Sequence, residues 1–214
     1  MYRPGYQSFG PMLTPAIKNL LIANVAVFAA MFLLPYIGNF FFAYFSLIPA
    51  RTIFNFEIWR VFSYMFLHGG FSHILFNMFA LWMFGISLER IWGSREFYKF
   101  YFLTGLFAGF SSLLVNFDSG IPIVGASGAI YGILMACALF FPEQEVYLYF
   151  LLPIKMKYFA LGLGVIEFFV GMSANDGIAH SAHLGGMIAG YLYLRSKYGN
   201  RIPKITELFK KKHY

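Results

Sequence analysis

The sequence contains few charged residues and a single cysteine. Asp, Glu, Lys and Arg make up 12% of its 214 residues, whereas an ordinary soluble domain carries roughly 25%. Hydrophobic residues make up 59% of the chain, which indicates an integral membrane protein. Cys137 has no second cysteine to pair with, so a disulfide within the chain is excluded and a cysteine-based metal site is not expected. We expect Cys137 to pack as a small apolar residue.

Six apolar stretches are long enough, or nearly long enough, to cross a membrane as helices. They are roughly 17–36, 72–89, 98–117, 126–141, 158–174 and 178–196. A spanning helix needs about 20 mostly apolar residues, while a membrane strand has about ten of alternating polarity. The sequence therefore predicts an all-α membrane protein with six transmembrane helices. This bundle would occupy 17–196, between a cytoplasmic lead at 1–16 and a basic tail at 197–214.

The basic residues are divided unevenly between the two sides of the predicted bundle. Six spans place fourteen of the sixteen Lys and Arg residues on the side of the two termini, and only Arg51 and Arg60 on the other. Because cytoplasmic loops carry an excess of Lys and Arg, both termini are expected in the cytoplasm. The net charge of +7 then reflects topology and contact with anionic membrane lipid. Nucleic-acid binding is not expected, because these residues are scattered along one membrane face.

The loop predicted between the first two spans is long and aromatic. It covers roughly 36–70, and its Phe, Tyr and Trp residues are typical of a segment in the membrane–water interface. Loops of this length are uncommon without a function, so we expect it to support or cover a site.

Several polar side chains fall in the outer half of the predicted bilayer. His73 and Asn77 lie in the first turns of the second span, Ser127 begins the fourth, and His180 and His183 begin the sixth. These three spans all run from outside to inside. Polar groups within a membrane are expensive and commonly mark functional sites. Their convergence at one depth is difficult to explain by helix packing alone.

The stretch GASGAIYG at 125–132 places Ser127 at the start of a short apolar helix. A serine nucleophile needs a base within hydrogen-bond reach and donors for the oxyanion. We expect His183 to be the base. His73, Asn77 and the backbone N–H of Ser127 are the expected donors.

Glycines on the fourth and sixth spans predict how Ser127 and His183 would meet. Gly125 and Gly128 flank the serine, and Gly186 and Gly190 follow the histidine on one helix face. Small residues at such spacings let two membrane helices approach closely. We therefore expect these two spans to pack backbone to backbone.

The sequence favours a dyad of serine and histidine over a triad. A triad would add a carboxylate that orients the histidine. Both aspartates, Asp118 and Asp176, lie in loops, and Glu167 is the only carboxylate deep in an apolar stretch. Tyr131, one turn after Ser127, is placed to pack against the imidazole. Glu167 is expected to be hydrogen-bonded inside the bundle, with a gating or substrate-side role as the alternative.

Two other kinds of site remain open from the residues alone. A zinc ion could be held by His180 and His183 with His68 or His73, but the zinc-protease pattern of two histidines around a glutamate is missing. A transporter or channel would also explain polar groups in the membrane, but its site usually lies near the midplane and often between repeats. Neither feature is evident, and no metal or other cofactor is expected.

Four short motifs lie in order along the predicted spans. They are EIWR at 57–60, HILFN at 73–77, GASG at 125–128 and AHLGGMIAG at 182–190. Together they resemble the Trp-Arg, His-xxx-Asn, Gly-x-Ser-Gly and Ala-His-xx-Gly-xxx-Gly motifs of the rhomboid intramembrane serine proteases. The resemblance covers roughly 17–196, and four motifs in order make it specific.

The resemblance implies a six-helix rhomboid bundle that hydrolyses peptide bonds in or near transmembrane segments. It implies Ser127 as nucleophile, His183 as base and Tyr131 as the ring stacked on that histidine. It also implies oxyanion stabilisation by His73 and Asn77, and a structural role for the loop residues Trp59 and Arg60. Single-span membrane proteins would be the substrates. The short chain is similar to the small prokaryotic form, which implies the bacterial inner membrane with the active site open to the outer side.

Overall fold

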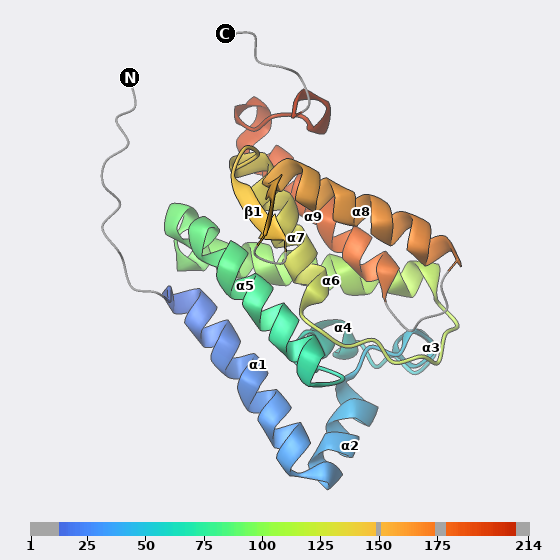
Figure 1. The fold of residues 1–214 in the computed structure, drawn as a ribbon. Helices are drawn as coiled ribbons and strands as arrows, with labels where there is room; N and C mark the ends of the chain where they lie inside the picture. The colour runs from blue at the N-terminus through green and yellow to red at the C-terminus, as the bar shows by residue number, and fades with distance from the viewer. Residues whose placement is uncertain (1–12, 149–150, 174–178, 209–214) are drawn as a thin grey trace, which may run out of the picture.

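The protein is a bundle of helices, seen here in a computed structural model that describes residues 13–148, 151–173 and 179–208 (Figure 1). Its six principal helices are α1 (Pro15–Leu33), α5 (Phe71–Trp92), α6 (Ser94–Val115), α7 (Ser127–Phe140), α8 (Met156–Ser173) and α9 (His180–Tyr198). Each lies within a few residues of a predicted apolar stretch, and the predicted all-α membrane fold is confirmed. Parts of the predicted lead (1–12) and tail (209–214), and Asp176, lie outside the described residues.

Three of these helices, α1, α5 and α6, are long and apolar enough by themselves to cross a membrane. The helix α7 is also apolar but has only 14 residues, a length of about 21 Å. A hydrocarbon core is about 30 Å thick, so α7 begins or ends below the membrane surface. The number of membrane crossings stays a prediction.

Helix α7 forms the centre of the bundle. Its side chains are buried on nearly every face, and it contacts α5, α6, α8 and α9. A helix that is apolar all round is stable only when neighbours surround it. In Figure 1, α1 packs on the outside of α5, away from α7. The first residue of α7 therefore lies among the neighbouring helices.

The start of α1 is fixed by a carboxylate from α5. Glu89 accepts hydrogen bonds from the backbone N–H groups of Ala16 (2.7 Å) and Ile17 (2.9 Å), and from the hydroxyl of Thr14. The first N–H groups of a helix have no partner within the helix, and a carboxylate suits the positive end of its dipole. Ser94, at the start of α6, donates to the same carboxylate (2.6 Å). This side chain joins three helices at one end of the bundle.

The aromatic loop between α1 and α5 is folded into short helices. These are α2 (Pro35–Phe45), α3 (Pro49–Phe54), α4 (Arg60–Ser63) and the 3₁₀ helix η1 (Tyr64–Phe66). Prolines begin α2 and α3, where a missing N–H costs nothing. Several large side chains of this segment stay exposed, including Tyr36, Phe54, Phe56 and Ile58. A segment at the membrane interface would expose such side chains, and the position of this loop at the interface stays a prediction.

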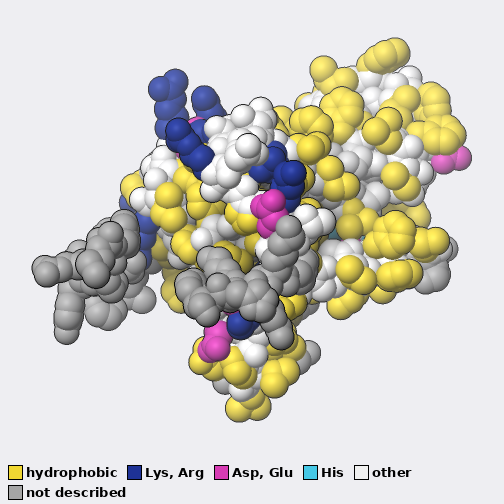
Figure 2. All heavy atoms as spheres, turned by 90° about the horizontal axis from the view of Figure 1, so that it is seen from above, with side chains coloured by type: hydrophobic (Ala, Val, Ile, Leu, Met, Phe, Trp, Pro, Cys, Tyr) yellow, Lys and Arg dark blue, Asp and Glu magenta, His cyan; other side chains and the backbone are white. Residues whose placement is uncertain are grey.

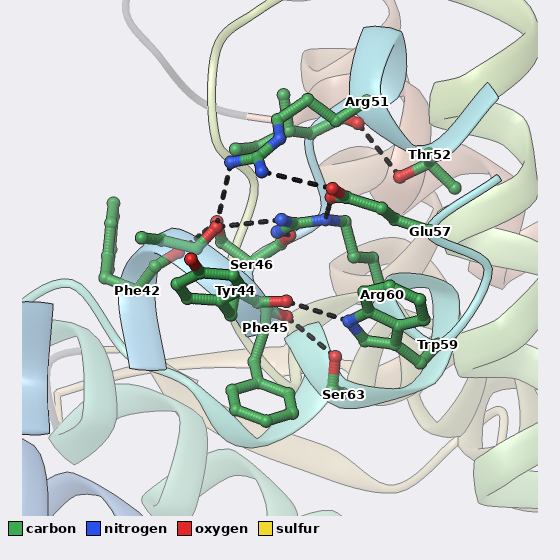
Figure 3. Close-up of polar contacts among 12 residues, drawn as sticks. Phe42, Tyr44, Phe45, Ser46, Arg51, Thr52, Glu57, Trp59, Arg60 and Ser63 are labelled. Carbon is green, nitrogen blue, oxygen red and sulfur yellow. Dashed lines mark hydrogen bonds and ion pairs between the residues drawn. The ribbon is translucent and has the colours of Figure 1, made fainter. Parts of the chain in front are cut away.

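The Trp-Arg pair holds this loop together (Figure 3). Arg60 is fully buried and donates to the carbonyls of Ser46 (2.6 Å) and Ala43 (2.8 Å) and to the Glu57 carboxylate. Burial alone would raise the pKa of Glu57. The hydrogen bond and charge of Arg60, together with the charge of Arg51, outweigh burial and hold the pKa of Glu57 below its usual range. The Trp59 indole N–H donates to the Tyr44 carbonyl at 2.9 Å. Both side chains thus bond to backbone carbonyls of the same loop, and their predicted structural role stays a prediction.

A small antiparallel hairpin precedes α8 and was missed by the sequence analysis. Its strands are β1 (Glu145–Leu148) and β2 (Leu152–Lys155), paired from Glu145 with Lys155 to Leu148 with Leu152. Beside it, Glu143 accepts from both Lys155 and Lys157 at 2.6 Å, and Lys157 also donates to the Leu208 carbonyl (2.9 Å). The described part of the tail, with the 3₁₀ helices η2 (Gly199–Arg201) and η3 (Ile205–Glu207), is thereby packed against the bundle.

The basic side chains gather at the end of the bundle that carries this hairpin. Figure 2 looks onto that end and shows Lys and Arg side chains over it, surrounded by hydrophobic ones. Arg51 and Arg60 lie at the opposite end, in α3 and α4 (Figure 1). The two ends differ in charge as the sequence predicted, whereas the side of the membrane that each faces stays a prediction.

Candidate active site

Ser127 is the first residue of α7, and the chain turns sharply before it. Gly125 has a φ of +124°, a backbone conformation that favours glycine. The loop that leads to it is held from both sides. Ile123 exchanges two backbone hydrogen bonds with Leu47 (2.8 and 2.9 Å), and the Gly125 N–H donates to the Tyr64 carbonyl at 2.9 Å. The serine therefore starts its helix in a fixed direction, beneath the folded outer loop.

His183, in the first turn of α9, reaches Ser127 across the bundle. Its Nε2 lies 2.7 Å from the Ser127 Oγ, although 56 residues separate the two in sequence. The start of α9 is tied to α6, because the hydroxyls of Ser181 and Ser112 lie 3.1 Å apart and the Asn116 amide donates to Ser181 at 3.3 Å. The imidazole is thus held within direct hydrogen-bond distance of the hydroxyl.

The close contact between α7 and α9 depends on the glycines predicted to allow it. A Cβ atom added to Gly186 would collide with the carbonyl oxygen of Gly128. One turn later, a Cβ on Gly190 would lie 3.0 Å from the Gly132 carbonyl oxygen and 3.1 Å from its Cα. The two backbones therefore touch at two successive turns, as small-residue helix pairs do in membranes. This approach sets the distance between serine and histidine.

Tyr131 covers one face of the imidazole. Its ring stacks on His183 with the centroids 4.4 Å apart and the planes 7° from parallel. Four residues separate Tyr131 from Ser127, so both project from the same side of α7. The stacking fixes the plane of the imidazole as it faces the serine.

The structure brings a carboxylate to the other nitrogen of His183, which corrects the sequence analysis. Glu167 Oε1, from α8, lies 3.0 Å from His183 Nδ1. The Nδ1–H is not aligned with this oxygen, so the contact is a close electrostatic one rather than a well-formed hydrogen bond. The sequence favoured a dyad without an orienting carboxylate, whereas Glu167 lies beside the histidine in the structure. The dyad itself stays a prediction. The expectation that Glu167 is hydrogen-bonded inside the bundle is confirmed by contacts with Tyr131 and His180.

The side chains expected to stabilise an oxyanion lie on α5, facing Ser127. His73 Nδ1 accepts a long hydrogen bond (3.4 Å) from the Gly69 backbone N–H. Because Nδ1 accepts this bond, the proton of the neutral ring belongs on Nε2. Nε2 faces Gly125: a Cβ atom added to that glycine would lie 2.8 Å from it. Asn77 uses one of its two amide hydrogens to bond the His73 carbonyl at 2.8 Å. Both residues can therefore present an N–H donor toward the serine.

These side chains line one cavity of about 470 Å³. Its walls are Tyr64, Gly69, His73, Asn77, Pro122, Ile123, Val124, Ser127, Ala179, Ala182 and His183. Its walls are mostly apolar, and the polar side chains among them could bind the water that a hydrolytic reaction needs. The cavity is lined by the four residues predicted as nucleophile, base and oxyanion donors, whereas Trp59 and Arg60 do not line it.

Tyr64 is a wall residue that the sequence analysis missed. It is almost fully buried, its hydroxyl donates to the Gly105 carbonyl at 2.7 Å, and its own carbonyl holds Gly125. Only its position just after the Trp-Arg pair could have singled it out.

The histidines considered as zinc ligands direct their ring nitrogens to different groups and not to one common point. His180 directs Nδ1 to Glu167 (2.6 Å), while His183 directs Nε2 to Ser127. His68 is buried with its ring edge against His73, the centroids 5.1 Å apart. Among the described residues, no group of three His, Cys, Asp or Glu side chains is placed to hold a metal ion.

Fold and site together define a helical membrane protein in which a serine and a histidine meet in a cavity between helices. Residues 55–198 match the Rhomboid domain family, which covers most of the bundle. The protein belongs to the rhomboid family. The predicted small prokaryotic form, by contrast, stays a prediction.

Named relatives support this assignment. The chain is 32% identical to RHOMBOID-like protein 5 of Arabidopsis thaliana over 69% of its own length and 48% of that protein's. It is 32% identical to rhomboid protease GluP of Bacillus subtilis over 63% of its length and 25% of that protein's. To rhomboid protease GlpG of Pectobacterium atrosepticum it is 30% identical over 83% and 61%. The chain thus spans half or less of the first two of these relatives.

Proposed function

We propose that this protein is an intramembrane serine endopeptidase, with Ser127 as nucleophile and His183 as general base. The observation that carries the proposal is the 2.7 Å contact between Ser127 Oγ and His183 Nε2 inside a cavity that His73 and Asn77 also line. A serine is a weak nucleophile until an adjacent base accepts its proton. Rhomboid proteases among the relatives support the same reaction class.

The first half of the reaction forms an acyl-enzyme. His183 Nε2 takes the Ser127 hydroxyl proton as Oγ bonds to the substrate carbonyl carbon. The negative charge moves to the carbonyl oxygen, where His73, Asn77 and the Ser127 backbone N–H donate hydrogen bonds. The N–H groups at the start of α7 have no partner within the helix and favour negative charge there. His183 then gives its proton to the amine nitrogen as the peptide bond breaks.

The second half releases the acyl group by hydrolysis. A water molecule in the cavity gives a proton to His183 and attacks the ester carbonyl. The same donors stabilise the second oxyanion. The bond between Ser127 Oγ and the acyl carbon then breaks as His183 returns the proton to Oγ, which releases the carboxylic acid product and restores the free enzyme.

The substrates we propose are single-span membrane proteins. Ser127 lies inside the bundle at the start of a helix too short to cross a bilayer, so a peptide bond must enter the cavity to reach it. An intact substrate helix hides its carbonyls in hydrogen bonds, and the segment at the cleavage site would therefore unwind. Membrane lipid would surround the apolar helices, and no nucleic acid or metal partner is proposed.

We place the protein in a bacterial inner membrane with both termini in the cytoplasm. The basic end of the bundle would then face the cytoplasm, and the outer loop and the cavity would face the other side. Cysteines introduced singly at exposed positions of each end, such as Phe56 and Asn200, would be labelled from opposite sides by a membrane-impermeant reagent. Labelling of both from the same side would refute this orientation.

The proposed activity is tested with purified protein and a fluorescent single-span substrate. The unmodified protein, Ser127→Ala and His183→Ala are compared, each with and without a metal chelator. We expect cleavage by the unmodified protein, unaffected by the chelator, and its loss in both variants. Cleavage by Ser127→Ala at the native rate would refute the proposal, and loss with the chelator would favour a metal site. Binding without cleavage by the unmodified protein would favour a non-proteolytic relative.

A further inference from the structure

Glu167 is a carboxylate with three partners at the edge of the proposed active site. It lies in the middle of α8, with only 11% of its side chain exposed. Its Oε1 accepts the Tyr131 hydroxyl and lies 3.0 Å from His183 Nδ1, while its Oε2 lies 2.6 Å from His180 Nδ1. A carboxylate at this depth is costly unless several groups compensate its charge.

These partners also hold the carboxylate in place. Tyr131 belongs to α7, and His180 and His183 lie three residues apart in the first turn of α9. Tyr131 contacts both the carboxylate, through its hydroxyl, and the imidazole of His183, through its ring. The oxygen beside Nδ1 is therefore positioned by a side chain that also fixes the plane of the imidazole.

The two nitrogens of His183 consequently face two different groups. Nε2 meets the serine hydroxyl at 2.7 Å, and Nδ1 meets the carboxylate at 3.0 Å. A histidine acts as a base toward a serine only if Nε2 carries no proton, which requires the proton on Nδ1. A carboxylate beside Nδ1 favours that tautomer and attracts the imidazolium that forms during the reaction.

We propose that Glu167 is a positioning residue for His183, so that serine, histidine and glutamate act as one unit. It keeps the proton of the neutral imidazole on Nδ1 and stabilises the imidazolium after proton transfer from Ser127. This inference rests on the proposed serine-protease function. Because the Nδ1–H is not aligned with the carboxylate, its contribution is electrostatic, and we expect a smaller effect than an aligned carboxylate gives.

Substitution of Glu167 separates this role from a purely structural one. Glu167→Gln keeps the shape but removes the charge, and we expect kcat to fall on the order of tenfold to a hundredfold with KM unchanged. Glu167→Asp keeps the charge and should recover part of kcat. The matched control is Glu96→Gln, because Glu96 also accepts a tyrosine hydroxyl, that of Tyr193, but lies at the other end of α6 from the cavity. We expect Glu96→Gln to cleave at the native rate.

A double-mutant cycle tests whether Glu167 acts through His183. The readout is the rate at which a fluorophosphonate probe modifies Ser127. In the native background Glu167→Gln should slow this rate, and in the His183→Ala background it should change nothing further. Equal slowing in both backgrounds, or a native kcat for Glu167→Gln, would overturn the inference.

The unmodified protein offers a test that does not depend on the folding of any variant. With ¹⁵N-labelled histidine, NMR should show His183 with its proton on Nδ1 when the imidazole is neutral. A proton on Nε2 instead would overturn the inference. Failure of the proposed function is distinguishable, because it would appear as native cleavage by Ser127→Ala whatever the tautomer of His183.

Discussion

The carbonyl oxygen of Gly128 occupies the space that a side chain on Gly186 would need. Gly128 directly follows Ser127, and Gly186 lies three residues after His183 on the same helix. The backbone contact between α7 and α9 therefore sets the distance between the two proposed catalytic side chains. A change of a single methyl group at this contact is expected to separate them.

Gly186→Ala tests this contact. Overpacking a tight interface costs about 1–3 kcal/mol, and the only relief is for α9 to move away from α7. We expect a lower midpoint of thermal unfolding in detergent and a loss of most cleavage activity. Gly162→Ala on α8 is the matched control, since a Cβ there meets nothing within 4 Å. Native activity in Gly186→Ala would show that the glycine contact does not set the site.

Gly125→Ala tests the turn that precedes Ser127. Its φ of +124° strains any other residue, and the added Cβ would lie 2.8 Å from His73 Nε2. If His73 is an oxyanion donor, its displacement should lower kcat by about 10²–10³-fold with little change in KM. Gly120→Ala, in the same loop but with open space around its Cβ, should keep the native kcat. A Gly125→Ala enzyme that retains kcat would remove His73 from the proposed oxyanion site.

Arg60→Ala tests the support of the outer loop. Its guanidinium is fully buried with two carbonyls and the Glu57 carboxylate, and removal of one partner of a buried pair costs about 3–5 kcal/mol. The side chain of Arg51, the other arginine on Glu57, is 41% exposed, and Arg51→Ala should cost only about 0–1 kcal/mol. Thermal unfolding of both variants measures the difference. Equal losses would contradict a structural role specific to Arg60.

Glu143 provides a test by pH. Hydrogen bonds from Lys155 and Lys157 lower the pKa of this carboxyl from 4.5 to about 2. A lowered pKa means that its ion pairs are fully formed above pH 4.5 and are lost as the pH falls through about 2. Carbon NMR of labelled glutamate should therefore show a midpoint well below 4.5 for Glu143. Lys155→Gln should move the midpoint upward, and an unchanged midpoint would contradict the pairing.

The helices and the serine–histidine pair could be predicted because each rests on a local signal. Apolar runs mark the six principal helices, and the glycines beside Ser127 and after His183 mark where two of them touch. The short helices α2–α4 could not be predicted from the sequence. Their aromatic residues and prolines indicate an interfacial segment, but they do not determine where its helices begin and end. The hairpin β1–β2 was missed because strands of four residues give too little alternation to detect.

The position of Glu167 could not be predicted for a different reason. Its place deep in an apolar stretch marked it as important, but sequence spacing along α8 does not say which face of that helix meets α9. That orientation depends on packing among three helices, which brings Glu167 to Tyr131, His180 and His183 together. The tyrosine stacking, by contrast, follows from the four-residue spacing of Ser127 and Tyr131 on one helix.

The most direct test of the central claim is to locate the residue that a fluorophosphonate probe modifies. The protein is treated in detergent, digested and analysed by mass spectrometry, beside the His183→Ala variant. The account predicts a single adduct on Ser127 in the unmodified protein and a greatly slowed reaction in His183→Ala. An adduct on another serine, or equal labelling of Ser127 without His183, would contradict it.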